Sequence, residues 1–175
     1  MKYLFGLFLA CFFLGCSVKP VTVPSQERVA QLVGQLVSLD RNVSHEEAQR
    51  LASDIFGYTA KLTQQYELVS PPMFHNFLVN TGMREGGLCY QWSDALYAHL
   101  HANKYPSFEF HLAVANQGEY WSEHNALVVA PKGGKVEEGI IIDPWRHSGN
   151  LFFEKFKKDS LYEWKHRLDR CGCTE

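Results

Sequence analysis

Apolar residues in the first half of the chain recur with the period of an α-helix. Between residues 26 and 40 they follow the i, i+3, i+4, i+7 spacing of an amphipathic helix. A second helix is predicted to begin at Ser44, because Ser44 and Glu47 have the spacing of a capping box. A third helix is expected over residues 71–82, which open on a proline pair, and a fourth over residues 88–101.

After Pro106 the apolar period changes from helical to alternating. Residues 108–114 alternate apolar with more polar side chains, which is typical of a strand with one buried face. Residues 124–130 and 140–143 are two further apolar runs, and the turn-forming segment 131–135 indicates a hairpin between them. Since helices come first and antiparallel strands follow, we expect an α+β domain with N-terminal helices packed on a small antiparallel sheet.

The first residues of the chain have the pattern of a secretory signal. Residues 1–15 combine a basic start with an apolar run too short to span a bilayer comfortably. The end of this run, Leu14-Gly15-Cys16-Ser17, resembles the signal of bacterial lipoproteins, in which cleavage precedes the cysteine and the cysteine carries a lipid. That resemblance implies a membrane anchor through the lipid on Cys16, and Ser17 implies the outer membrane, facing the periplasm. An uncleaved N-terminal anchor is the alternative, and both readings place the domain outside the cytoplasm.

The rest of the chain is expected to form a tether and one domain. Residues 16–25 contain two prolines and indicate a short tether. Residues 26–175 are long enough for a single domain with its own core, and 46% hydrophobic against 21% charged residues is typical of a packed protein. The net charge of −2 provides no strong field for nucleic acid, so we expect no nucleic-acid partner.

The cysteines divide into groups with different expected fates. Cys11 is lost with the signal and Cys16 carries the lipid, which leaves Cys89, Cys171 and Cys173 in an oxidising compartment. A disulfide between Cys171 and Cys173 would leave Cys89 as a free thiol. Two alternatives are a disulfide from Cys89 to the tail, and a metal held by the tail cysteines with a histidine. We expect no metal, because a second closely spaced pair of ligands is missing.

Cys89 has the position of a reactive thiol. It follows Gly86 and Gly87 at the first turn of the predicted fourth helix, where unpaired N–H groups and the helix dipole favour a thiolate. The two glycines are expected to let the backbone approach a substrate closely. His124 would supply the proton for a departing amine, and Asp143 would orient the imidazole. His124 opens one predicted strand and Asp143 closes its hairpin partner, so their side chains are expected to lie side by side.

Further residues are candidates for the oxyanion hole and for the substrate groove. The backbone N–H of the nucleophile is expected to form one half of an oxyanion hole, and the side-chain candidates for the other half are Asn76 and Asn80. Both asparagines could equally be polar groups on a helix surface. Three aromatic residues are candidates for lining the substrate groove, although aromatic side chains more often belong to a core. These are Trp92, Tyr120 and Trp121.

Three short segments give the chain a family resemblance. They are GLC at residues 87–89, HNALVV at 124–129 and IIDPW at 141–145. Together they resemble the transglutaminase-like branch of the papain-type cysteine enzymes, over roughly residues 85–146. That family places a cysteine on a helix, a histidine on a strand and an aspartate on the next strand, often followed by proline. The resemblance implies a papain/transglutaminase-like fold with the nucleophile at the start of the core helix. Ala126 departs from the pattern, because the family commonly has an aromatic residue there.

We therefore expect a lipid-anchored cysteine enzyme of the bacterial envelope. It would cleave or transfer the acyl group of an amide through a thioester on Cys89, without a cofactor, and hydrolysis is favoured because it needs only water. Its substrate would be a peptide, a protein or peptidoglycan. A peptidoglycan endopeptidase or amidase is one alternative, although the Asp-Cys-Ser-Gly motif usual in those enzymes is absent. The other alternative is a non-catalytic interaction lipoprotein on a degenerate version of the fold, in which the cysteine would be buried or disulfide-bonded.

Overall fold

A computed structural model describes residues 23–170 of the chain. The predicted signal segment, the lipidation site Cys16 and the proposed Cys171–Cys173 disulfide all lie outside the described residues, as does most of the tether. The described part is an α+β fold of four α-helices followed by a five-stranded antiparallel sheet. None of its helices has the length and apolar character needed to cross a bilayer.

The four predicted helices and three predicted strands are present close to their predicted bounds. The helices are α2 (Gln26–Val37), α3 (His45–Gln65), α4 (Pro72–Asn80) and α5 (Cys89–Ala102). The strands are β1 (Phe108–Ala115), β2 (His124–Pro131), β3 (Ile140–Asp143), β4 (Phe152–Lys155) and β5 (Lys165–His166). The short strands β4 and β5, which the apolar pattern did not predict, lie at the two edges of the sheet in the order β4-β3-β2-β1-β5.

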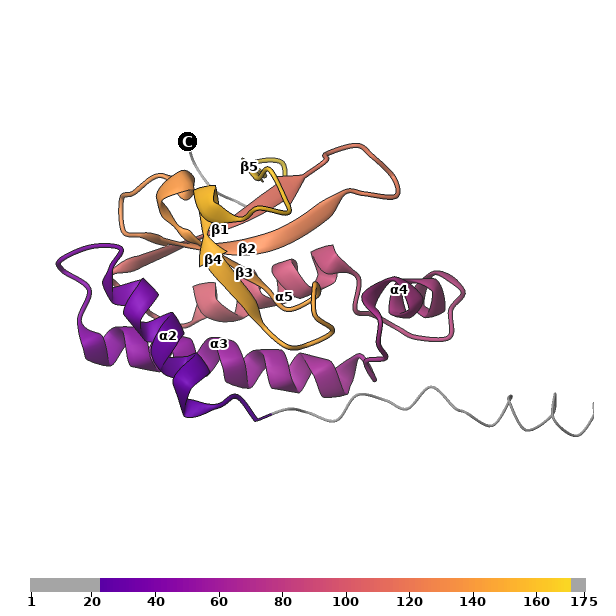
Figure 1. The fold of residues 1–175 in the computed structure, drawn as a ribbon, viewed down its shortest axis with the longest axis horizontal. Coiled ribbons are helices and arrows are strands. Elements are labelled where there is room, and N and C mark those ends of the chain that lie inside the picture. Colours follow the sequence, from indigo (N-terminus) through magenta and orange to yellow (C-terminus); the bar gives the residue numbers. More distant parts are fainter. Residues whose placement is uncertain (1–22, 171–175) are drawn as a thin grey trace, which may run out of the picture.

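The central strand β2 is buried on both faces, which explains why its sequence is almost continuously apolar. All residues of β1 except Glu109 are also buried, which corrects the expected single buried face of this strand. Side chains that alternate along it belong to two separate clusters, with Leu127 and Val129 in one and Ala126 and Val128 in the other. Figure 1 shows the helices on one side of the sheet, where α5 packs on β1 and β2, α3 packs on α5, and α2 packs on α3. The main core lies between these layers.

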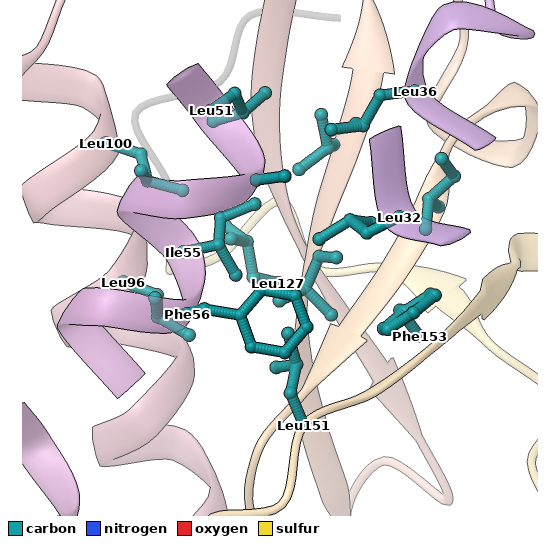
Figure 2. Packing of buried hydrophobic residues seen from close by; sticks show 14 of the residues in the cluster. Leu32, Leu36, Leu51, Ile55, Phe56, Leu96, Leu100, Leu127, Leu151 and Phe153 are labelled. Atoms are coloured by element: carbon teal, nitrogen blue, oxygen red, sulfur yellow. The ribbon is translucent and has the colours of Figure 1, made fainter. Parts of the chain in front are cut away.

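Leucine, isoleucine and phenylalanine side chains from all layers fill this core (Figure 2). Burial of each such side chain stabilises the fold by about 1.5–3 kcal/mol. The labelled members come from α2, α3, α5, β2 and the segment that ends in β4: Leu32, Leu36, Leu51, Ile55, Phe56, Leu96, Leu100, Leu127, Leu151 and Phe153. The apolar faces of α2 and α3 thus belong to the same core as the inner face of the sheet.

The predicted capping box at the start of α3 is formed only in part. The hydroxyl of Ser44 accepts a hydrogen bond from the backbone N–H of Glu47 at 3.1 Å, as expected. The carboxylate of Glu47 does not return to Ser44 but accepts from the backbone N–H of Ser107 at 3.0 Å. Glu47 therefore connects the start of α3 to the residue before β1.

Gly86 and Gly87 position the start of α5 against other protein groups, which corrects the expected role in substrate approach. A Cβ at Gly86 would lie 2.8 Å from the ring of Tyr66, and a Cβ at Gly87 would lie 2.3 Å from Nε2 of His75. Gly87 also has φ +116°, a conformation that favours glycine. The imidazole of His75 is buried. Its Nδ1 accepts a hydrogen bond from the backbone N–H of Val69 at 3.3 Å, and its Nε2 lies 2.8 Å from the backbone carbonyl oxygen of Gly86.

Replacement of Gly87 by alanine is expected to destabilise the protein by roughly 2–4 kcal/mol, because the new Cβ clashes with His75 and the backbone conformation becomes strained. Urea unfolding at neutral pH measures the change. Gly57→Ala is the matched control, since nothing lies within 4 Å of a Cβ at this position in α3. The control should gain about 0.5–1 kcal/mol from helix propensity. Equal effects of the two substitutions would contradict this role of Gly87.

Candidate active site

The structure brings Cys89, His124 and Asp143 together at one end of the sheet. Cys89 is the first residue of α5, His124 the first of β2 and Asp143 the last of β3. Nε2 of His124 lies 2.7 Å from Oδ2 of Asp143, and both side chains are buried. The two residues are diagonal rather than opposite, because the register that pairs Leu127 with Ile142 places Asp143 across from Ala126.

The thiol of Cys89 is free and surrounded by polar groups of the β2 start. Nδ2 of Asn125 lies 3.8 Å from Sγ, and Sγ lies 3.9 Å from the backbone carbonyl of Glu123. Nε2 of His124 is occupied by Asp143, so Nδ1 is the ring nitrogen left for the thiol. Nδ1 is buried and makes no hydrogen bond of ordinary geometry within the described residues. Such contacts are often loose without substrate and tighten during the reaction.

The ionisation of this pair is shifted toward thiolate and imidazolium. Burial raises the pKa of Cys89, but interaction with the His124 imidazole and hydrogen bonds from Asn125 outweigh it, so the pKa lies below its ordinary value. Burial lowers the pKa of His124, yet Asp143, together with Cys89, raises that pKa to about 9. A thiolate beside an imidazolium is the state that a nucleophilic cysteine requires near neutral pH.

Asp143 is kept ionised by its partners. Burial alone would raise the pKa of this carboxyl group, but His124 and then Arg146 hold it below the usual range. Arg146 donates twice, from its backbone N–H to Oδ1 at 3.1 Å and from Nε to Oδ2 at 2.9 Å. Arg146 was not predicted from the sequence, in which its only signal is its place three residues after Asp143.

Three aromatic rings surround the imidazole of His124. The ring centroids of Tyr162, Trp145 and Trp164 lie 4.6, 4.7 and 5.4 Å from that of His124. Aromatic faces attract cations, so these rings favour the imidazolium while excluding water from the His124–Asp143 hydrogen bond. Tyr162 and Trp164 are far from His124 in sequence and carry no motif that would have predicted this role.

The thiol opens into a cleft of ≈ 850 Å³ between α4 and the 116–123 segment. Figure 1 shows α4 and this β1–β2 connection at the same end of the molecule. Besides Cys89 and His124, the cleft is lined by large apolar side chains from both walls and by several amide groups. These include Met73, Asn76, Phe77, Asn80, Tyr90, Tyr120, Trp121, Asn125 and Trp145.

The predicted groove residues have different positions. Tyr120 and Trp121 line the cleft and are 84% and 81% exposed. Trp92 does not reach the cleft. It is 1% exposed, and its indole N–H donates to the carbonyl of Gly87 at 3.0 Å. Its predicted substrate contact is therefore corrected to a core position that supports the turn before α5.

Both predicted oxyanion candidates line the cleft. Oδ1 of Asn76 accepts a hydrogen bond from Nε1 of Trp145 at 3.0 Å, which anchors this amide, whereas Asn80 is exposed. The prediction did not include Asn125. Its carbonyl Oδ1 accepts from Arg167 at 2.7 Å, an arrangement that directs the amide nitrogen toward the sulfur of Cys89.

Between residues 23 and 170, no three His, Cys, Asp or Glu side chains are grouped so that they could hold a metal ion. No family model, curated protein or solved structure matches the chain.

Cys89 is expected to react with iodoacetamide at pH 7 roughly tenfold or more faster than free cysteine, because its lowered pKa increases the thiolate fraction. Mass spectrometry of the intact protein measures the rate. His124→Ala should slow the reaction toward that of an ordinary buried thiol, since the imidazolium is lost. His99→Ala, which removes a histidine paired with Asp54 on α3, is the control and should leave the rate unchanged. A wild-type rate no greater than that of free cysteine would contradict the activated thiol.

Proposed function

We propose that the protein is a cysteine enzyme that attacks an amide carbonyl through Cys89 and passes through a thioester. The observation that carries this proposal is the buried His124–Asp143 pair beside a free thiol that opens into the cleft. The same order of helix cysteine, strand histidine and next-strand aspartate supports a transglutaminase-like, papain-type relationship.

Each group has a defined task in the proposed reaction. The Cys89 thiolate attacks the carbonyl carbon, and negative charge develops on the carbonyl oxygen. The backbone N–H of Cys89, at the first turn of α5, and the anchored amide of Asn76 are the proposed donors to this oxygen. The His124 imidazolium gives its Nδ1 proton to the nitrogen, the C–N bond breaks, and the amine leaves.

The second half of the reaction releases the acyl group. A water molecule attacks the thioester carbonyl, neutral His124 accepts a proton from that water, and the C–S bond breaks to regenerate the thiolate and a carboxylic acid. Asp143 holds the imidazole in one orientation through both halves. An amine in place of water would give transfer. Hydrolysis is the preferred proposal because water needs no second binding site.

A non-catalytic interaction protein is the rival proposal, in which Cys89 would be buried or disulfide-bonded. The free thiol of Cys89 lines the cleft and has a lowered pKa, which favours the enzyme. The proposed place of action is the bacterial envelope, with anchoring through a lipid on Cys16. Peptides, envelope proteins and peptidoglycan stem peptides are the corresponding substrates.

Incubation of the protein with peptidoglycan fragments and with envelope protein extract is expected to yield Cys89-dependent products by mass spectrometry. Hydrolysis of a peptide bond adds water, hydrolysis of a side-chain amide exchanges ammonia for water, and transfer joins two molecules with loss of the leaving amine. Hydroxylamine should intercept the thioester and leave a hydroxamate on the attacked carbonyl. Cys89→Ala is the control. Identical products from wild type and Cys89→Ala would exclude the proposed nucleophile.

Trp121→Ala is expected to raise KM about fivefold for substrates with a large apolar side chain next to the attacked amide, which corresponds to about 1 kcal/mol of lost apolar contact. The rate of Cys89 alkylation should not change, because the side chain of Trp121 is exposed and its ring packs on Tyr120. Leu161→Ala removes an exposed apolar side chain that does not line the cleft and is the matched control. An unchanged KM in Trp121→Ala would place substrate binding elsewhere.

A further inference from the structure

A buried ion pair lies behind Asp143, on the side away from the thiol. The side chains of Arg146 and Asp159 are 7% and 1% exposed. Nη1 and Nη2 of Arg146 bond the two carboxylate oxygens of Asp159 at 3.1 and 2.5 Å, while Nε bonds Oδ2 of Asp143. Oδ2 of Asp143, which accepts from Nε of Arg146, is also the oxygen that accepts from His124.

The orientation of Arg146 is set by contacts that do not involve Asp143. Its guanidinium lies 3.7 Å from the ring centroid of Phe152 and 4.8 Å from that of Tyr162. Asp159 is held in turn by the indole N–H of Trp164 at 2.9 Å, in addition to the backbone N–H of Leu161. A guanidinium group held in this way donates from Nε to Asp143 in a single direction.

The charges along this row alternate in sign. They run from the thiolate of Cys89 through the His124 imidazolium and the Asp143 carboxylate to the Arg146 guanidinium and the Asp159 carboxylate. The positive charge of the Arg146 guanidinium offsets part of the electrostatic effect of Asp143 on His124. The negative charge of Asp159 in turn offsets part of the effect of Arg146.

The titratable groups that face His124 come from three separate elements. Cys89 faces it from α5, Asp143 from β3, and Tyr162 from the C-terminal segment. Arg146 and Asp159 act on it through Asp143. The neighbouring ion pair of Glu123 and Arg167 lies on the thiol side of the row and contacts Asn125.

We propose that Arg146, anchored by Asp159, is a positioning residue that fixes the Asp143 carboxylate toward His124 and balances its charge. The role of Arg146 in catalysis rests on the proposed function, whereas its effect on the titration of His124 does not. A merely structural ion pair would leave His124 unaffected or would disturb it in the same direction when either partner is removed. A charge-balancing pair predicts shifts of opposite sign.

The test is the titration of His124 by nitrogen NMR of histidine-labelled full-length protein, with the His124 signal assigned by its loss in His124→Gln. Arg146→Gln removes a positive charge and should move the His124 midpoint up by roughly 0.5–1 pH unit. Asp159→Asn removes a negative charge and should move the His124 midpoint down by a similar amount.

Two further variants are controls. Arg146→Lys keeps the charge and should restore the wild-type midpoint of His124. Lys132→Gln, which breaks an exposed contact with Glu109 at the end of β2 opposite His124, is the control for a remote charge and should produce no shift.

Shifts in the same direction, or no shift in either variant, would overturn the proposal. If Arg146→Gln does not fold, the downward shift in Asp159→Asn and the unchanged midpoint in Arg146→Lys decide the question by themselves. Iodoacetamide rates on the same samples separate the two proposals. A reactive wild-type Cys89 with unshifted midpoints overturns only this role of Arg146, whereas an unreactive Cys89 with opposite shifts overturns only the enzyme.

Discussion

The buried hydrogen bond between His124 and Asp143 is the interaction on which the rest of the site depends. A buried carboxylate and a buried imidazolium each lose most of their hydration, so neither is stable without a partner of opposite charge and further hydrogen bonds. The fold supplies these from several directions, with two donors from Arg146 on Asp143 and three aromatic rings around His124. Asp159 then balances Arg146, so that the row of buried charges ends without an unpaired member.

The thiol side of the same row is built differently, because it has to meet a substrate. Cys89 lies at the start of a helix whose position is set by close packing of Gly86 and Gly87 against Tyr66 and His75. This packing leaves no room for larger residues and places the sulfur beside β2, facing the cleft. The row of charged groups is therefore closed to water at Asp159 and open to the cleft at Cys89. This arrangement suits the proposed attack on an amide.

Much of the fold was predictable because its signals are local. Helical spacing in α2 and α3, the proline pair before α4 and the alternation in β1 all depend on residues close in sequence, and the observed bounds agree with them. The edge strands β4 and β5 are short, and β4 is only partly buried, so they carried little periodic signal. Trp92 was misplaced for a related reason, because an aromatic residue on an apolar helix has the same pattern in a core and in a groove.

By itself, the sequence determined the α+β order of elements and the three triad candidates, since a cysteine at a helix start and polar residues at strand ends are local features. Only the tertiary structure decided what surrounds them. Arg146 meets Asp159, Trp145 meets Asn76, and Tyr162 meets His124 through contacts between residues far apart in the chain or beyond the strand ends. Such contacts follow from how the layers pack, and the packing depends on side-chain volumes and buried charges summed over the whole core, which no short stretch of sequence encodes.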